Sequence, residues 1–140
     1  MAALSITKAN VAWVSGPVEP GTAGEALDAG DAVYRAASGK WLKAQADGTT
    51  VEAGENGYGM ALATADADGA RIQVALPGAI VGIGTGTAAI VYAIGTTAGD
   101  IVPVTDLVTT TQKVTPAFLG VGTSRLLVLG GAYNAGSVVP

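Results

Sequence analysis

IQVALPGAIVGIGTGTAAIVYAIGTTAG, residues Ile72–Gly99, contains no charged side chain and is bounded by Arg71 and Asp100. An apolar run of this length either crosses a bilayer as a helix or is buried inside a protein as strands and turns. A spanning helix needs about 20 mostly apolar residues, and Val74–Ile94 would supply them. The choice between these two structures sets the class of the protein.

The composition of this run favours strands. It contains several weak helix formers, namely Pro77, Gly78, Gly82, Gly84 and Gly86. A proline costs about 3 kcal/mol and a glycine about 1 kcal/mol relative to alanine inside a helix. The large apolar residues are mainly Ile and Val, which pack best on a pleated sheet, and no Lys or Arg cluster flanks the run to orient a membrane span. The sequence therefore predicts two or three buried strands, over Arg71–Leu76, Ala79–Ile83 and Ala88–Ile94.

Composition limits the partners of the chain. Its 140 residues suggest one domain, and only 13% of them are charged, against about 25% in soluble domains. Because the chain has little polar surface, we expect partners to cover much of it through oligomerisation or assembly. The net charge of −4 lacks the positive field that nucleic-acid binding needs. We expect no disulfide, because Cys is absent, and no secretory signal, because no basic region leads into an apolar one.

The chain is predicted to divide into an N-terminal arm with an elbow, residues 1–26, and a single β-barrel-like domain, residues 27–140. Ser5–Val14 is expected to form one strand with Val11 and Trp13 on one face. Regular structure is then expected to break at Gly16, Pro17, Pro20, Gly21 and Gly24. Arms of this kind often become ordered against a neighbour.

Short strands with glycine-rich turns follow the arm. Asp31–Ala36 and Lys40–Gln45 are predicted to pair as a hairpin around Ser38-Gly39. Further strands are expected at Tyr58–Thr64, Asp100–Val104, Lys113–Val121 and Arg125–Leu129, and one helical turn at Asp106–Thr111. No segment keeps a helical period. The sequence therefore predicts an all-β fold, a compact barrel or sandwich of short antiparallel strands preceded by an extended N-terminal arm.

Two short stretches of the chain are similar to each other. Ala29–Val33 is AGDAV, and Ala98–Val102 is AGDIV. This similarity is compatible with two related β-halves, although a chain with 21 glycines also produces such matches by chance.

The sequence contains neither His nor Cys, which excludes a Ser-His-Asp triad and a His/Cys zinc site. Asp66–Gly69, DADG, matches the middle of a calcium loop, but Thr64 and Ala75 stand where the first ligand and the bidentate Glu belong. Gly82–Gly86, GIGTG, lacks the Lys-Ser/Thr of a phosphate-binding loop. Both stretches are therefore interpreted as turns. We expect no catalytic, cofactor-binding or metal-binding residues and no enzymatic activity.

Several stretches give the chain a family resemblance. They are GDAVY at Gly30–Tyr34, SGKWLKA at Ser38–Ala44, GMALA at Gly59–Ala63, VALPGA at Val74–Ala79, VYAIGTTAGDIVPVTDL at Val91–Leu107 and LGVGTS at Leu119–Ser124. On these stretches the chain resembles the small decoration, or cement, proteins of tailed bacteriophage heads. The likeness covers Ala29–Leu129, and its breadth carries more weight than any one motif.

The resemblance implies a structural role in a virion. Proteins of this family are compact β domains that bind the outer face of the capsid shell, often as homotrimers, and clamp adjacent capsomers. The chain would then be made in the host cytoplasm and lie on the outer surface of the capsid. Its partners would be the major capsid protein shell and further copies of itself. The composition adds the expectation that neither nucleic acid nor a membrane is a partner.

Two groups of apolar residues are predicted to make these contacts. The first belongs to the arm, would dock on the capsid or a neighbour by adding a strand to its sheet edge, and comprises Ile6, Val11 and Trp13. The second lies in the uncharged run, where a single sheet wall rarely needs both faces apolar, and comprises Ile80, Ile83 and Ile90. We expect this second group at or near a contact between copies of the chain.

Two other functions fit parts of the pattern. A head or tail fibre, or an adhesive β module of a virion, shares the Gly- and Thr-rich strands, although a fibre usually has a repetitive shaft that this chain lacks. A carboxylate-driven hydrolase would use a pair such as Asp28 and Asp31, or Glu52 and Glu55, within a cleft. Both pairs fall in predicted turns.

Overall fold

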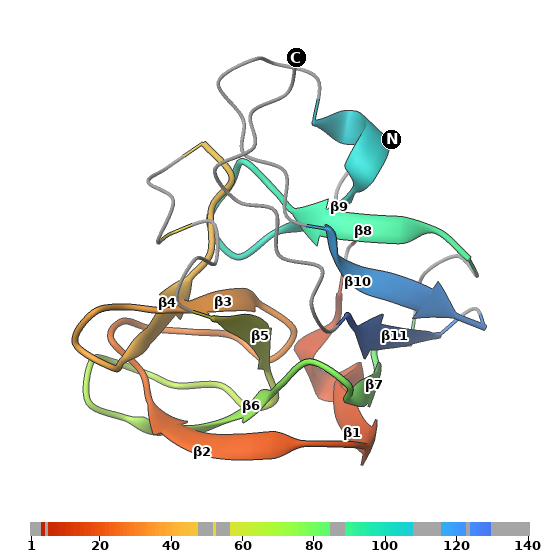
Figure 1. Ribbon diagram of the computed structural model, residues 1–140. Helices are drawn as coiled ribbons and strands as arrows, with labels where there is room; N and C mark the ends of the chain where they lie inside the picture. Colours follow the sequence, from red (N-terminus) through yellow and green to blue (C-terminus); the bar gives the residue numbers. More distant parts are fainter. Residues whose placement is uncertain are drawn as a thin grey trace.

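A computed structural model describes residues 4, 6–47, 52, 57–84, 89–107, 116–122 and 124–129. Within these residues nearly all regular structure is β, arranged as two antiparallel sheets (Figure 1). The predicted all-β class is confirmed. The sheets form a sandwich-like arrangement and not a closed barrel.

The first sheet has six strands. In spatial order they are β1 (Ala12–Ser15), β7 (Ile80–Gly82), β11 (Arg125–Val128), β10 (Pro116–Val121), β8 (Val91–Ile94) and β9 (Ile101–Pro103). The second sheet has five strands, in the order β2 (Val18–Thr22), β6 (Arg71–Ala75), β5 (Tyr58–Ala61), β3 (Ala32–Arg35) and β4 (Trp41–Lys43). Two short 3₁₀ turns, η1 (Lys8–Asn10) and η2 (Val104–Asp106), complete the described elements.

The uncharged run contributes strands to both sheets. It supplies most of β6 to the five-stranded sheet and then β7 and β8 to the six-stranded sheet. The chain changes sheets at the predicted Pro77-Gly78 turn, where Gly78 has a φ of +99° that favours glycine. The prediction of strands for this run is confirmed. Within the described residues, no helix is long and apolar enough to span a bilayer.

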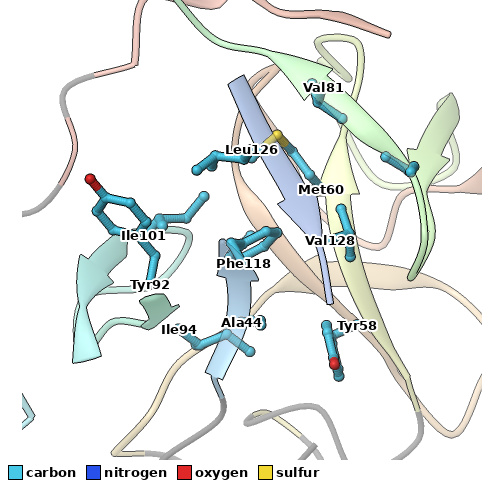
Figure 2. Close-up of a cluster of buried hydrophobic side chains, with 14 of the residues drawn as sticks. Ala44, Tyr58, Met60, Val81, Tyr92, Ile94, Ile101, Phe118, Leu126 and Val128 are labelled. Atoms are coloured by element: carbon cyan, nitrogen blue, oxygen red, sulfur yellow. The ribbon is translucent and has the colours of Figure 1, made fainter. Parts of the chain in front are cut away.

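The main core lies between the two sheets. Figure 2 shows its buried side chains, to which both sheets contribute. Phe118 and Leu126 come from the six-stranded sheet, and Met60 comes from the five-stranded sheet. All three are fully buried. Burying a side chain of this size contributes roughly 1.5–3 kcal/mol, so this layer holds the sheets together.

A second, smaller core lies on the other face of the five-stranded sheet. It contains Leu27, Val33, Trp41 and Val74. The sheet curls around this core, because Ala23, just after β2, bridges to Trp41 on β4. Strand β6 therefore has one face in each core. Val74 faces the smaller core, and Ala75 faces the main core.

The N-terminal stretch forms an edge strand in each sheet. Strand β1 pairs with β7, and β2 pairs with β6. The expectation that regular structure is broken between Gly16 and Gly24 is wrong for β2. Pro20 is tolerated there because an edge strand leaves one side of its backbone unpaired. Gly21 is needed because a Cβ at that position would lie 2.7 Å from Nε1 of Trp41.

The single strand expected at Ser5–Val14 is also wrong in part. A 3₁₀ turn, η1, occupies Lys8–Asn10, and β1 begins only at Ala12. The turn is closed by hydrogen bonds from Asn10 N to Thr7 O and from Val11 N to Lys8 O. The expected hairpin of β3 and β4 is confirmed. The helical turn expected at Asp106–Thr111 lies outside the described residues from 108 onward, and η2 ends at Asp106.

Candidate interaction surface

Residues 4–11 lie against the chain's own main core. The Leu4 amide donates a 2.8 Å hydrogen bond to the Ile101 carbonyl on β9. Ile6 and Val11 are half-buried and pack against the main core. Both side chains contact Gly30, where an added Cβ would lie 2.7 Å from Ile6 Cγ2 and 3.2 Å from Val11 Cγ2. These two residues of the predicted docking group therefore hold this segment on its own domain.

Trp13, the third residue of that group, is placed differently. Its side chain is 54% exposed, and Val14 beside it is 37% exposed. Every residue of β1 is exposed, and among the described strands β1 pairs only with β7. The indole N–H donates a 3.1 Å hydrogen bond to the Gly16 carbonyl, which fixes the ring. A fixed, exposed Trp on an edge strand has the properties of an interface anchor.

An open, apolar hollow of about 400 Å³ lies next to Trp13. Besides Trp13, it is lined by Val18, Leu62, Ala63 and Gln73. A second hollow of about 400 Å³ shares Ala63 and Gln73 with the first and extends along β2 and β6 as far as Arg71. We call the two hollows together the Trp13 groove. Because most of the first hollow is apolar, it leaves hydrophobic surface in contact with water.

The predicted subunit-contact residues fall in two environments. Ile83 is fully buried in the main core, so its side chain packs within its own chain. Ile80 on β7 and Ile90 before β8 are half-buried. Ile90 packs against the main core, and Ile80 lies opposite Ser15 of β1 and Leu127 of β11. Ile80 and Ile90 are the members of the group that retain exposed surface.

The two similar AGD stretches meet in space. The Ala32 amide donates a 3.0 Å hydrogen bond to the Gly99 carbonyl. Gly30 and Gly99 both have a positive φ, of +95° and +87°. A Cβ at Gly99 would lie 3.1 Å from Oδ1 of Asp31. Equivalent turns thus precede β3 and β9 and lie side by side, which the sequence similarity alone did not reveal.

A cavity of about 160 Å³ is lined by both turns and by Leu4, Ile6 and Lys8 of the N-terminal segment. Burial raises the pKa of the Asp31 carboxyl above its usual 3.8. The hydrogen bond that Asp31 Oδ2 accepts from the Asp28 amide, at 2.8 Å, and the charge of Lys43 oppose this rise in pKa. The neighbouring carboxylates of Asp28 and Asp100 reinforce it.

The acidic DADG stretch is a surface turn in the structure. Gly69 has a φ of +91°, and Asp68 accepts a 2.8 Å hydrogen bond from Lys40 Nζ. Among the described residues no group of three or more acidic, His or Cys side chains is arranged to hold a metal ion. Residues 85–88, which include the end of the GIGTG stretch, lie outside the described residues.

Comparison of the chain with family models, with curated proteins and with solved structures finds no match. Its surface is therefore interpreted from its own geometry. Among the described residues, the large hydrophobic side chains that are exposed are Trp13 and Val14, and an apolar hollow lies beside Trp13. Sequence reasoning identified Trp13 but missed Leu62, Gln73 and Arg71, because these residues are distant from Trp13 in the sequence and line the groove only in the folded chain.

Proposed function

We propose that this chain is a decoration protein of a tailed bacteriophage head. It binds the outer surface of the assembled capsid and stabilises the contacts between capsomers. The resemblance over Ala29–Leu129 supports this function. The structural observation that carries the proposal is Trp13, which is 54% exposed on an edge strand beside an apolar groove. A residue so placed is suited to contact with a partner.

Stabilisation would follow from mass action. A protein that binds only the assembled shell lowers the free energy of that state relative to the unassembled one. Many copies, each with a modest interface, reinforce one another when they bridge neighbouring capsomers. This role requires a rigid domain with a contact surface, and it requires no catalytic group.

We infer different tasks for the N-terminal residues. Because Ile6 and Val11 pack on their own core, we infer that the capsid contacts are made by Trp13 and by the outer edge of β1, which pairs with no second strand among the described residues. An extended segment of a neighbour can add to such an edge through main-chain hydrogen bonds. In the proposed homotrimer, the exposed parts of Ile80 and Ile90 contribute to contacts between copies. Sedimentation equilibrium of the purified chain measures this state, and a mass of one copy at all concentrations contradicts the trimer.

The proposal is tested with purified phage heads that lack the protein. We expect the full chain to co-sediment with expanded heads until a fixed number of copies per head is reached. Electron microscopy should then show a regular lattice of knobs on the shell. Sparse projections would favour the fibre or adhesive alternative, and no binding would contradict both the decoration and the clamp role.

A further inference from the structure

One face of β6 passes from buried to uncovered along its length. Arg71, Gln73 and Ala75 share this face, because side chains alternate along a strand. Ala75 is fully buried in the main core under the six-stranded sheet, whereas Gln73 and Arg71 are exposed. The face of β6 that packs against the six-stranded sheet at Ala75 is therefore left uncovered at Gln73 and Arg71, where it forms part of the Trp13 groove.

Two neighbouring strands and a loop give the groove its form. Pro20 and Thr22 of β2 lie opposite Gln73 and Arg71 in the antiparallel register. The Leu62 amide donates a 2.9 Å hydrogen bond to the Gln73 carbonyl, which holds the loop after β5 along the other side of β6. The floor of the groove is thus hydrogen-bonded sheet, and it keeps its shape without a ligand.

The groove carries a single charge, and its sign is opposite to that of the chain. Arg71 is the one charged residue that lines either hollow in the described part of the chain, while the chain has a net charge of −4. Within the described residues Arg71 makes no ion pair. Two carboxylates of the described residues are already paired with other cations, because Glu19 binds Arg35 at 2.6 Å and Asp68 binds Lys40 at 2.8 Å. A carboxylate for Arg71 would come from a partner.

We propose that the Trp13 groove binds an extended peptide segment of the capsid protein, with an apolar side chain between Trp13 and Leu62 and a carboxylate on Arg71. This inference rests on the proposed decoration function and names the contact surface. Side chains two residues apart on β6 are spaced by about 7 Å, the same repeat as in an extended peptide lying along it. A single arginine does not supply the cluster of cations that an anionic membrane or a nucleic acid requires.

The test uses the full chain, purified heads that lack it, and a charge reversal at the groove. Arg71→Glu should weaken binding to the heads at least about tenfold, the equivalent of about 1.4 kcal/mol, because it removes a hydrogen bond to a charged group. Arg125→Glu is the matched control, because Arg125 is an exposed strand residue outside the groove and the substitution changes the net charge equally. The control should bind like the unmodified chain. Equal binding by both variants overturns the inference.

Folding and the proposed function are checked separately in this experiment. Both variants should keep the circular dichroism spectrum and the thermal midpoint of the unmodified chain, so that a loss of binding reports the contact. If the unmodified chain does not bind the heads, the decoration function fails and the inference fails with it. If the unmodified chain and Arg71→Glu bind equally, the inference alone fails.

A crosslinking experiment identifies the occupant directly. Ala63 is exposed and lines both hollows, so Ala63→p-benzoylphenylalanine places a photoreactive group in the groove. After irradiation of decorated heads, we expect a crosslink to a capsid-protein segment that contains Asp or Glu. A crosslink to a second copy of this chain, or none on heads that remain decorated, overturns the inference.

Discussion

The Tyr58 hydroxyl on β5 donates a 2.7 Å hydrogen bond to the carbonyl of Leu129, the residue that follows β11. This contact joins the five-stranded sheet to the end of the six-stranded sheet across the main core. Tyr58→Phe should lower the free energy of unfolding by about 1–3 kcal/mol, because it leaves a partly buried carbonyl without this donor. Urea denaturation measures the change. An unchanged midpoint would show that another group satisfies the carbonyl.

Gly21 and Gly82 provide a matched pair of strand glycines. A Cβ at Gly21 would lie 2.7 Å from Trp41 Nε1, whereas at Gly82 the nearest atom would be 3.5 Å away. Gly21→Ala should destabilise the protein by about 1–3 kcal/mol through overpacking against the indole ring. Gly82→Ala should have an effect near zero. Thermal unfolding of both variants tests this, and equal midpoints would contradict the tight packing of Trp41.

Trp13→Ala separates binding from stability. Because Trp13 is 54% exposed, we expect little change in the free energy of unfolding. Binding to purified heads should fall about 30-fold, the effect of losing an anchor residue worth about 2 kcal/mol. Glu19→Gln, on the neighbouring edge strand, serves as the binding control. If Trp13→Ala binds the heads as tightly as the unmodified chain, Trp13 is not a capsid contact and the proposed function loses its structural support.

The contribution of Asp31 to the free energy of unfolding should decrease as the pH rises. Its folded pKa is raised by burial above the usual 3.8, so the folded state holds the proton to a higher pH than the unfolded state does. Stability from this group is fully present below 3.8, falls as pH rises through the folded pKa, and is constant above it. Asp31→Asn should flatten this slope and leave the neutral-pH stability equal or higher.

Unfolding free energies at a series of pH values from acid to neutral check this prediction. Asp66→Asn is the control, because Asp66 is exposed in the surface turn and is not among the groups that shift the pKa of Asp31. The control should keep the slope of the unmodified chain. The same slope for Asp31→Asn would assign the effect to another group.

The strands of the domain could be predicted from the sequence because their signals are local. The alternation at Arg71–Ala75, the Pro77-Gly78 turn and the hairpin of β3 and β4 each depend on neighbouring residues. Strand β2 could not be predicted in this way. Its Pro20 and Gly21 resemble a broken segment until the partner strand and the Trp41 indole are in place.

The surface was predictable only in part. The sequence singled out Trp13, but the same pattern also selected Ile6, Val11 and Ile83, which the structure packs within the chain. Apolar character alone does not distinguish a core residue from a contact residue. That distinction depends on which strands cover each face, and the edge positions of β1 and β2 follow from long-range pairing.

The chain passes from one sheet to the other at two corners, and these corners touch. Gly16, between β1 and β2, lies so close to the turn before β7 that a Cβ there would be 2.5 Å from Ala79 Cα. The Leu76 amide adds a 3.1 Å hydrogen bond to the Pro17 carbonyl. Together the two corners hold the sheets against each other at this edge of the sandwich. Strand β1, which carries Trp13, is therefore tied to both sheets, through its pairing with β7 and through this contact between the corners.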